Sequence, residues 1–155
     1  MRLCFLAQAG AGKMNKDFME SAKKAAEQSR CLRSKVGAVL IKNNEIISEG
    51  HNGPIKDFID CIKTGCVREK NNIPHGENND ICYGVCAEQN VILECAAKGI
   101  SCLGGEIYTT RQPCSVCVKA MKAAGIKKVF YSEPRFDEFS IELLDKSGIE
   151  AIKID

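Results

Sequence analysis

The second half of the chain alternates strictly between helix and strand patterns. Apolar spacing predicts three helices, each ended by a glycine, at residues 87–99, 114–125 and 137–148. Three strand patterns separate and follow these helices, at residues 106–110, 127–132 and 149–154. Strands joined through helices run parallel in one sheet, with the helices packed on its faces. This half of the chain therefore predicts an α/β protein.

The first half adds a helix, a hairpin and a long irregular segment. Residues 14–30 carry helix formers at amphipathic spacing, and residues 36–41 and 45–48 form a predicted hairpin around a short polar turn. Residues 52–83 are rich in Gly, Pro, Asn and charge. We therefore expect a three-layer α/β/α fold whose central mixed sheet has about five strands.

The length and composition of the chain predict a single folded domain. Its 155 residues are 45% hydrophobic, which suits a single core. We expect the domain to cover residues 14–155, with a cysteine-rich insertion at about 52–83. Residues 1–13 resemble a phosphate-binding loop only incompletely and are interpreted as a tail.

Charge and cysteine content narrow the class of protein. A formal charge of +2 argues against a surface that binds a nucleic acid duplex. The sequence has no apolar run of the ~20 residues that a membrane helix needs and no convincing signal peptide, which predicts a cytoplasmic protein without membrane contact. In a reducing compartment, ten cysteines indicate metal ligands rather than disulfides.

Three cysteines stand at predicted helix starts in a pattern typical of a metal site. Cys114 and Cys117 follow Pro113 and share one helix face, while Cys86 begins another helix. Helix N-termini lower thiol pKa values and so favour the thiolates that zinc binds. Three protein ligands leave a fourth position for water, and Glu88 stands two residues after Cys86 as a candidate proton carrier. Redox dithiols share the Cys-x-x-Cys spacing, but they require neither the third cysteine nor the glutamate.

The chain resembles the cytidine and deoxycytidylate (dCMP) deaminase superfamily over nearly all of residues 15–155. The resemblance is carried by the cysteine-x-glutamate pair and the Pro-Cys-x-x-Cys motif. It is closer to the dCMP branch, through "CLRSKVGAVLIKNNEIISEGHNGP", the cysteine insertion, "AEQN" and "TTRQPCSVCVKAMKAAGIKKVFY".

The resemblance implies zinc-dependent hydrolysis of dCMP to dUMP and ammonia, with Glu88 as the catalytic proton carrier. It also implies a homo-oligomer, often a hexamer. Asn52 matches a position expected to touch the sugar, although it is equally well explained as a turn residue. Lys35 and Arg111 are our candidates for the substrate phosphate, and any single basic residue could also be solvated. The alternatives are a deaminase of another cytosine nucleoside, nucleotide or modified base, or a noncatalytic zinc-binding module.

One ligand departs from the pattern of the dCMP branch. Most of that branch has histidine where this chain has Cys86, so three thiolates would surround the zinc. Thiolate charge reduces the acidity of a zinc-bound water, which a nearby cation and helix dipoles would restore. Arg111 is our candidate for that cation.

Four further cysteines suggest a second, structural zinc. The resemblance implies this site in the insertion. A long polar loop without a hydrophobic core of its own can be stabilised by such a metal ion. We expect the ligands to be Cys31, Cys61, Cys66 and Cys82, with His75 as the alternative to one of them.

Overall fold

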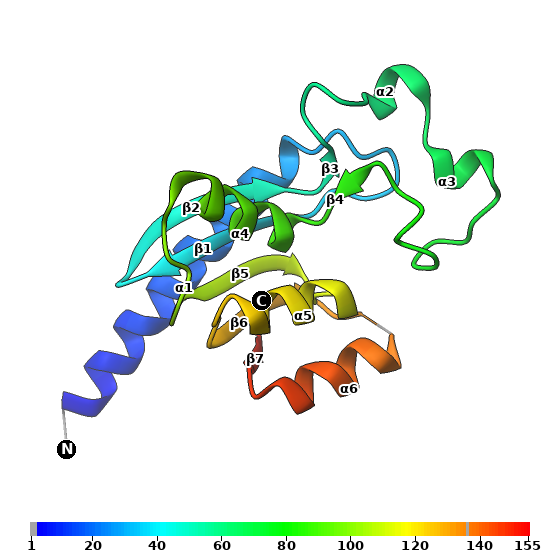
Figure 1. Cartoon of the computed structure of the whole chain (residues 1–155). Helices are drawn as coiled ribbons and strands as arrows, with labels where there is room; N and C mark the ends of the chain where they lie inside the picture. The colour runs from blue at the N-terminus through cyan, green and yellow to red at the C-terminus, as the bar shows by residue number, and fades with distance from the viewer. Residues whose placement is uncertain (1–2, 136) are drawn as a thin grey trace.

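A five-stranded mixed sheet forms the centre of the molecule. The computed structural model describes residues 3–135 and 137–155, with side chains from residue 12 onward. The strands lie in the order β2-β1-β5-β6-β7 (Figure 1), and the predicted α/β architecture with about five strands is confirmed. A separate pair, β3 and β4, lies at the two ends of the insertion.

The hairpin is the antiparallel part of the sheet. It consists of β1 (Gly37–Lys42) and β2 (Glu45–His51), and β1 also pairs antiparallel with β5 (Glu106–Arg111). Its turn is made by Asn43 and Asn44, both with positive φ, which suits the tight turn predicted there. From β5 onward, β6 (Lys128–Glu133) and β7 (Glu150–Lys153) pair in parallel.

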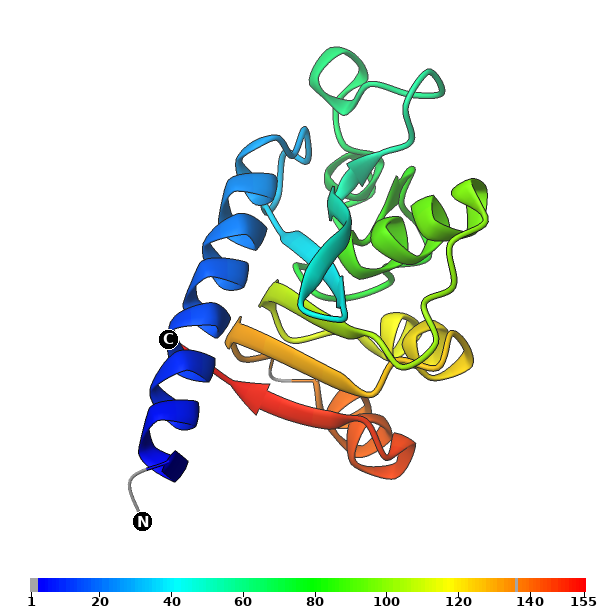
Figure 2. The same ribbon diagram turned by 90° about the vertical axis from the view of Figure 1, so that its left-hand side faces the viewer.

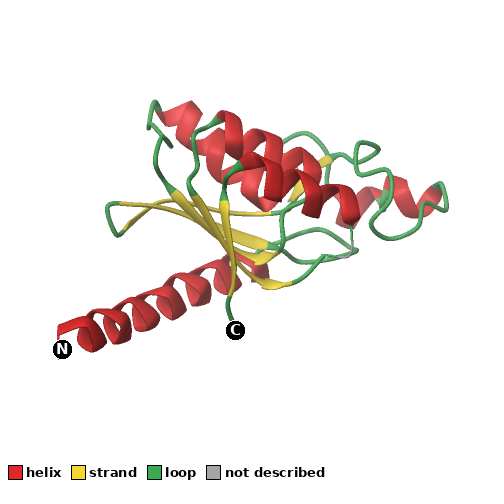
Figure 3. Cartoon of the chain, turned by 90° about the horizontal axis from the view of Figure 1, so that it is seen from below, coloured by secondary structure: helices red, strands yellow, loops and turns green. Residues whose placement is uncertain are grey.

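Helix α1 (Leu3–Glu27) covers one face of the sheet by itself (Figure 3). Met19 and Ala22 pack there against Val39, Tyr108 and Phe130. The helix comes very close to the sheet at Gly37, where a Cβ atom would lie 2.0 Å from the carbonyl oxygen of Ala22.

The start of α1 differs from the sequence-based expectation. We predicted a helix from residue 14 after a tail, but residues 3–13 are helical and continuous with it. Residues 1 and 2 lie outside the described residues. The division into a tail and a domain stays a prediction.

Three helices cover the opposite face: α4 (Ala87–Lys98), α5 (Ser115–Ala123) and α6 (Glu138–Ser147) (Figures 2 and 3). The main core lies between them and the sheet, and it includes Leu40, Val91, Ile107, Val118 and Val129. Gly99 and Gly148 adopt left-handed backbone and end α4 and α6, as predicted.

The insertion contains little regular structure. Its elements are β3 (Gly53–Pro54), α2 (Cys61–Thr64), α3 (Val67–Lys70) and β4 (Gly84–Val85). It extends from the end of the sheet at which α4 and α5 begin (Figure 1). Among the described residues, no helix is both long and apolar enough to cross a bilayer.

Candidate metal and active site

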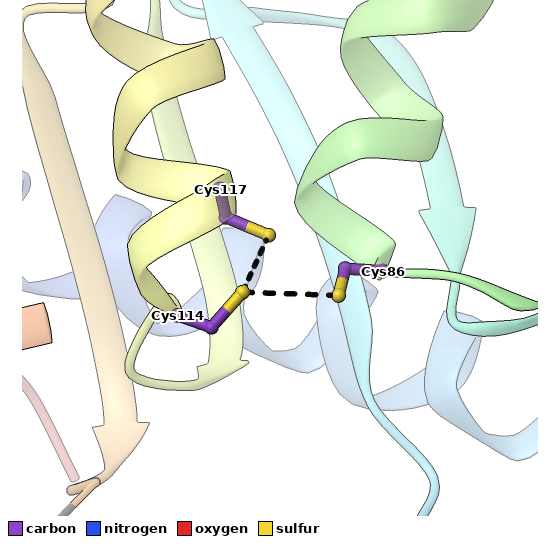
Figure 4. Close-up of side chains that lie close together, drawn as sticks. All are labelled: Cys86, Cys114 and Cys117. Carbon is purple, nitrogen blue, oxygen red and sulfur yellow. Dashed lines mark hydrogen bonds between the residues drawn. The ribbon is translucent and has the colours of Figure 1, made fainter. Parts of the chain in front are cut away.

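Cys86, Cys114 and Cys117 come together between the starts of α4 and α5 (Figure 4). The Sγ atom of Cys114 lies 3.4 Å from that of Cys117 and 4.0 Å from that of Cys86. All three sulfurs lie within 4.8 Å of one another. Such a set of three soft donors suits a zinc ion with one further coordination position.

The fold explains why these three side chains meet. Cys86 and Cys114 are the residues that cap the first turns of α4 and α5, and Cys117 is fully buried one turn into α5. The backbone N–H of Cys86 donates to Oε1 of Gln89 at 3.3 Å, which fixes the first turn of α4. The positions of the three sulfurs are therefore set by two packed helices and not by the loops of the insertion.

Contacts among the thiols change their acidities. Hydrogen-bonding contacts with Cys117 and then Cys86 lower the pKa of Cys114 to about 2, and Arg135 contributes a smaller lowering through its charge. The same contacts with Cys114 raise the pKa values of Cys86 and Cys117. Cys114 is therefore the thiol of this cluster that is most readily ionised.

Glu88 lies beside the cluster and is almost completely buried, with 4% of its surface exposed. Its Oε2 lies 3.4 Å from Sγ of Cys117, and its Oε1 accepts a hydrogen bond from Oγ1 of Thr109 at 2.9 Å. Burial raises the pKa of Glu88, and the hydrogen bond from Thr109 opposes that rise. A carboxyl group whose pKa is raised in this way is suited to accept a proton and return it.

The second set of cysteines is less tightly gathered. Cys31, Cys61, Cys66 and Cys82 all line one cavity, hereafter the site cavity, together with His75. Burial raises the pKa of Cys61, and the nearby thiols of Cys82, Cys66 and Cys31 add to the rise. Within the described part of the chain, however, no three ligand atoms of this set all lie within 4.8 Å of one another.

The three predicted substrate residues have different surroundings. Asn52 lines the site cavity, but its amide is engaged inside the protein: Nδ2 donates to Ser34 O at 3.0 Å, and Oδ1 accepts from Ser29 Oγ and Val36 N at 2.8 Å. Its observed contacts hold the loop before β1.

Lys35 is exposed, is not part of the cavity lining, and approaches the carbonyl oxygen of Glu27 at 3.4 Å. Arg111 lines the cavity and lies 3.2 Å from Glu133.

Two arginines in the cavity lining were missed by sequence reasoning. Arg68 belongs to α3 of the insertion, and Arg135 follows the end of β6. The signal for Arg135 was available, because β5 and β6 were predicted to be parallel and the ends of parallel strands meet at one edge. Arg68 has no such signal, since its place depends on how the insertion folds.

Comparison with known proteins identifies the family. A sequence model described as the cytidine and deoxycytidylate deaminase zinc-binding region matches residues 13–133, which include all three clustered cysteines and Glu88. The chain belongs to this family. The match agrees with the three-sulfur cluster, so zinc binding is a property of the family to which this site belongs.

Individual relatives support the same conclusion. ComE operon protein 2 of Bacillus subtilis is 33% identical over 91% of this chain and 72% of its own length. The deoxycytidylate deaminase of Schizosaccharomyces pombe is 31% identical over 86% of this chain, which spans only 41% of that relative.

A solved structure extends the likeness to the fold. The dCMP deaminase of cyanophage S-TIM5, in complex with dCMP and dUMP, has a TM-score of 0.73 and 29% identity, covering 92% of this chain and 97% of its own. The predicted membership of the dCMP branch is confirmed.

Proposed function

We propose that this protein is a zinc-dependent deaminase that hydrolyses dCMP to dUMP and ammonia. The observation that carries the proposal is the buried Glu88 beside the three-sulfur cluster. The likeness to deoxycytidylate deaminases supports dCMP as the substrate. A purely structural zinc site needs no buried carboxyl group next to its ligands, which argues against the noncatalytic alternative.

The donor set fits zinc, with Cys86, Cys114 and Cys117 as the ligands. A zinc ion held there would supply Lewis acidity that makes a water molecule a stronger nucleophile. Glu88 would take a proton from that water as its oxygen bonds to C4 of the cytosine ring. Glu88 would deliver that proton to N3, then take the remaining proton from the oxygen on C4 and pass it to the exocyclic amine, so that the C4=O bond forms, the C4–N bond breaks and ammonia leaves.

The surroundings of Glu88 support this role. Thr109 lies on β5, is fully buried, and holds one carboxylate oxygen through its hydroxyl group. The other carboxylate oxygen is directed to the metal ligands. The carboxyl group is therefore fixed in orientation, which a proton carrier between two partners requires.

The test is a substrate panel with a matched variant. Purified zinc-loaded protein should lower the cytosine absorbance of dCMP and release ammonia, with weaker turnover of CMP, deoxycytidine, cytidine and dCTP. Glu88→Gln keeps the shape of the side chain and should lower kcat by about 10²- to 10⁴-fold. Wild-type turnover in the Glu88→Gln variant would exclude the mechanism, and no ammonia from any compound would favour a noncatalytic zinc module.

A second zinc is part of the proposal. Its ligands would be Cys31, Cys61, Cys66 and Cys82, with His75 as the alternative to one of them, because all five line the same cavity. Metal analysis should give about two zinc ions per chain. One zinc per chain would leave only the site at Cys86, Cys114 and Cys117.

We also propose that the protein self-associates, as expected from the resemblance to the deaminase family. The support is a set of large apolar side chains exposed on the helical face, among them Leu93 of α4, Val116 of α5 and Phe139 of α6. Light scattering after size exclusion gives the mass directly, and a monomer at micromolar concentration would contradict the proposal.

A further inference from the structure

The segment that joins β3 to α2 forms a second hollow on the insertion, hereafter the insertion hollow. It has a volume of about 330 Å³ and is lined by Arg30 and by residues 54–60 and 63. Its apolar side chains include Ile55, Phe58 and Ile59, and Phe58 is 66% exposed. An exposed apolar surface with charged groups around it is typical of a place where another protein surface binds.

A tight turn presents Phe58 at this surface. The backbone N–H of Phe58 donates to the carbonyl oxygen of Ile55 at 3.2 Å, and Asp57 between them has a left-handed backbone with φ of 60°. The ion pair between Arg30 and Asp60 ties the end of the same segment to the residues that follow α1. The exposure of Phe58 is therefore set by the path of the backbone.

The charges of the insertion hollow are unbalanced once this ion pair is set aside. Lys56 and Lys63 both line the hollow, and neither forms an ion pair with any described side chain. Asp57 is the remaining acid of the lining. Two lysines against one aspartate favour an occupant that brings acidic groups together with an apolar side chain.

Helix α6 carries side chains of this complementary kind. Glu138, Ile141 and Asp145 are all exposed. They share one face of the helix, because Ile141 is three residues after Glu138 and four before Asp145. Neither acid forms an ion pair among the described residues. This face of α6 therefore combines an apolar side chain with an unpaired carboxylate on each side of it along the helix.

The insertion hollow and α6 lie at opposite ends of the molecule (Figures 1 and 2). The two surfaces therefore cannot meet within one chain, and the complementary partner is a second copy. A contact between two different surfaces of identical chains is heterologous, so that it either closes into a ring or continues as a filament.

We propose that α6 of one copy binds in the insertion hollow of the next copy, with Ile141 packed against Phe58 and the acids of α6 beside the two lysines. This inference rests on the proposed self-association and names the two surfaces that meet. Pro54 lines both the insertion hollow and the site cavity. Occupation of the hollow would thus also stabilise one wall of the site cavity, which couples assembly to the site.

The main test exchanges charges between the two surfaces. Lys63→Glu and Asp145→Lys should each weaken association of the zinc-loaded protein by at least about tenfold, because each brings like charges together. Light scattering over a dilution series measures this association. An equimolar mixture of the two variants should recover wild-type association to within about threefold, since each variant offers the charge that the other now requires. Lys24→Glu, at an exposed position on α1, is the matched control and should associate as wild type does.

A second pair of variants tests the apolar contact. Phe58→Ser and Ile141→Ser change exposed side chains, so each variant should keep the circular dichroism of wild type. Each should weaken association by about 10- to 100-fold, because an apolar anchor is lost from the contact. These two variants preserve the test if Lys63→Glu fails to fold.

The outcomes separate this contact from self-association itself. A monomeric wild type would overturn both proposals. If wild type associates and all four variants associate equally well, another surface joins the copies and this contact is wrong, while self-association stands. If each charge variant weakens association but their mixture does not recover it, Lys63 and Asp145 do not face one another and the contact is again overturned. None of these measurements uses a substrate, so they are independent of the proposed deamination.

Discussion

The two cysteine sets of this protein differ in what holds them in place. Cys86, Cys114 and Cys117 are placed by two helices packed on a sheet, and their sulfurs already lie within 4.8 Å of one another. The four cysteines at the insertion are carried by loops and single helical turns, and no three of their sulfurs, among the described residues, lie as close. Core packing brings the first three sulfurs together, whereas the proposed second site would depend on a metal ion to bring its segment into order.

The difference between the two cysteine sets predicts that a change in the first set causes the largest loss of activity. Cys114→Ala should remove one zinc per chain and lower dCMP turnover by more than about 10³-fold, because the site loses its metal and with it the Lewis acid. Zinc quantification and circular dichroism should show a folded protein with one remaining zinc. Cys102→Ala, outside both sets, is the control, and full activity in Cys114→Ala would contradict the assignment.

A change in the second set should affect the structure of the insertion more than the catalytic step. Cys66→Ser is expected to lose one zinc, to expose the insertion to proteases, and to lower kcat/KM for dCMP by about 10- to 100-fold, because residues of the insertion line the site cavity. Limited proteolysis with metal analysis checks this expectation, and an unchanged zinc content would remove the second site from the account.

The hydrogen bond from Thr109 to Glu88 tests how rigid the first site is. Thr109→Val should lower kcat by about tenfold or more, the usual cost of losing a hydrogen bond to a charged group. The pKa of Glu88 is raised by burial and lowered by Thr109, so removal of the hydroxyl group raises that pKa further. The acidic limb of the pH profile should therefore move to higher pH. Thr110→Val is the neighbouring control. An unchanged acidic limb in Thr109→Val would show that Thr109 does not position the carboxyl group.

The smallest effect is expected where the insertion meets the end of α1. Arg30 and Asp60 form an ion pair there at 2.5 Å, and Arg30 lowers the pKa of Asp60. Asp60→Asn should make the insertion slightly more sensitive to proteases at neutral pH, with kinetic constants unchanged.

The pH dependence of that effect has a definite sign. A lowered pKa means that the contribution of Asp60 is present above its unfolded pKa and is lost as pH falls through the folded value. Wild type and Asp60→Asn should therefore become equally sensitive in acid. A difference that persists in acid would assign the effect to something other than the charge.

Local patterns in the sequence predicted most of the architecture. Gly99 and Gly148 marked helix ends correctly, and the polar turn at Asn43 and Asn44 marked the hairpin. The helix was predicted to begin at residue 14, where the amphipathic spacing begins, but α1 begins at Leu3 and continues through Gly10 and Gly12, which lower helix propensity. The observed helix shows that such propensity is a weak guide at an element boundary.

The candidate site was predictable where its residues follow a local motif. Cys86, Glu88, Cys114 and Cys117 could be found because helix starts fix their direction. Arg68 and the internal hydrogen bonds of Asn52 could not be found, because both depend on contacts between segments distant in sequence. A residue in an irregular insertion carries no periodic signal that would indicate which way it points.

The proposed active site consists of three sulfurs that bind a zinc ion and of Glu88, which exchanges protons with a water molecule at the remaining coordination position. X-ray absorption at the zinc edge of the Cys66→Ser variant isolates this site from the second one. We expect three sulfur ligands and one oxygen or nitrogen ligand. Four sulfur ligands, or a spectrum in which sulfur is a minor contributor, would contradict it.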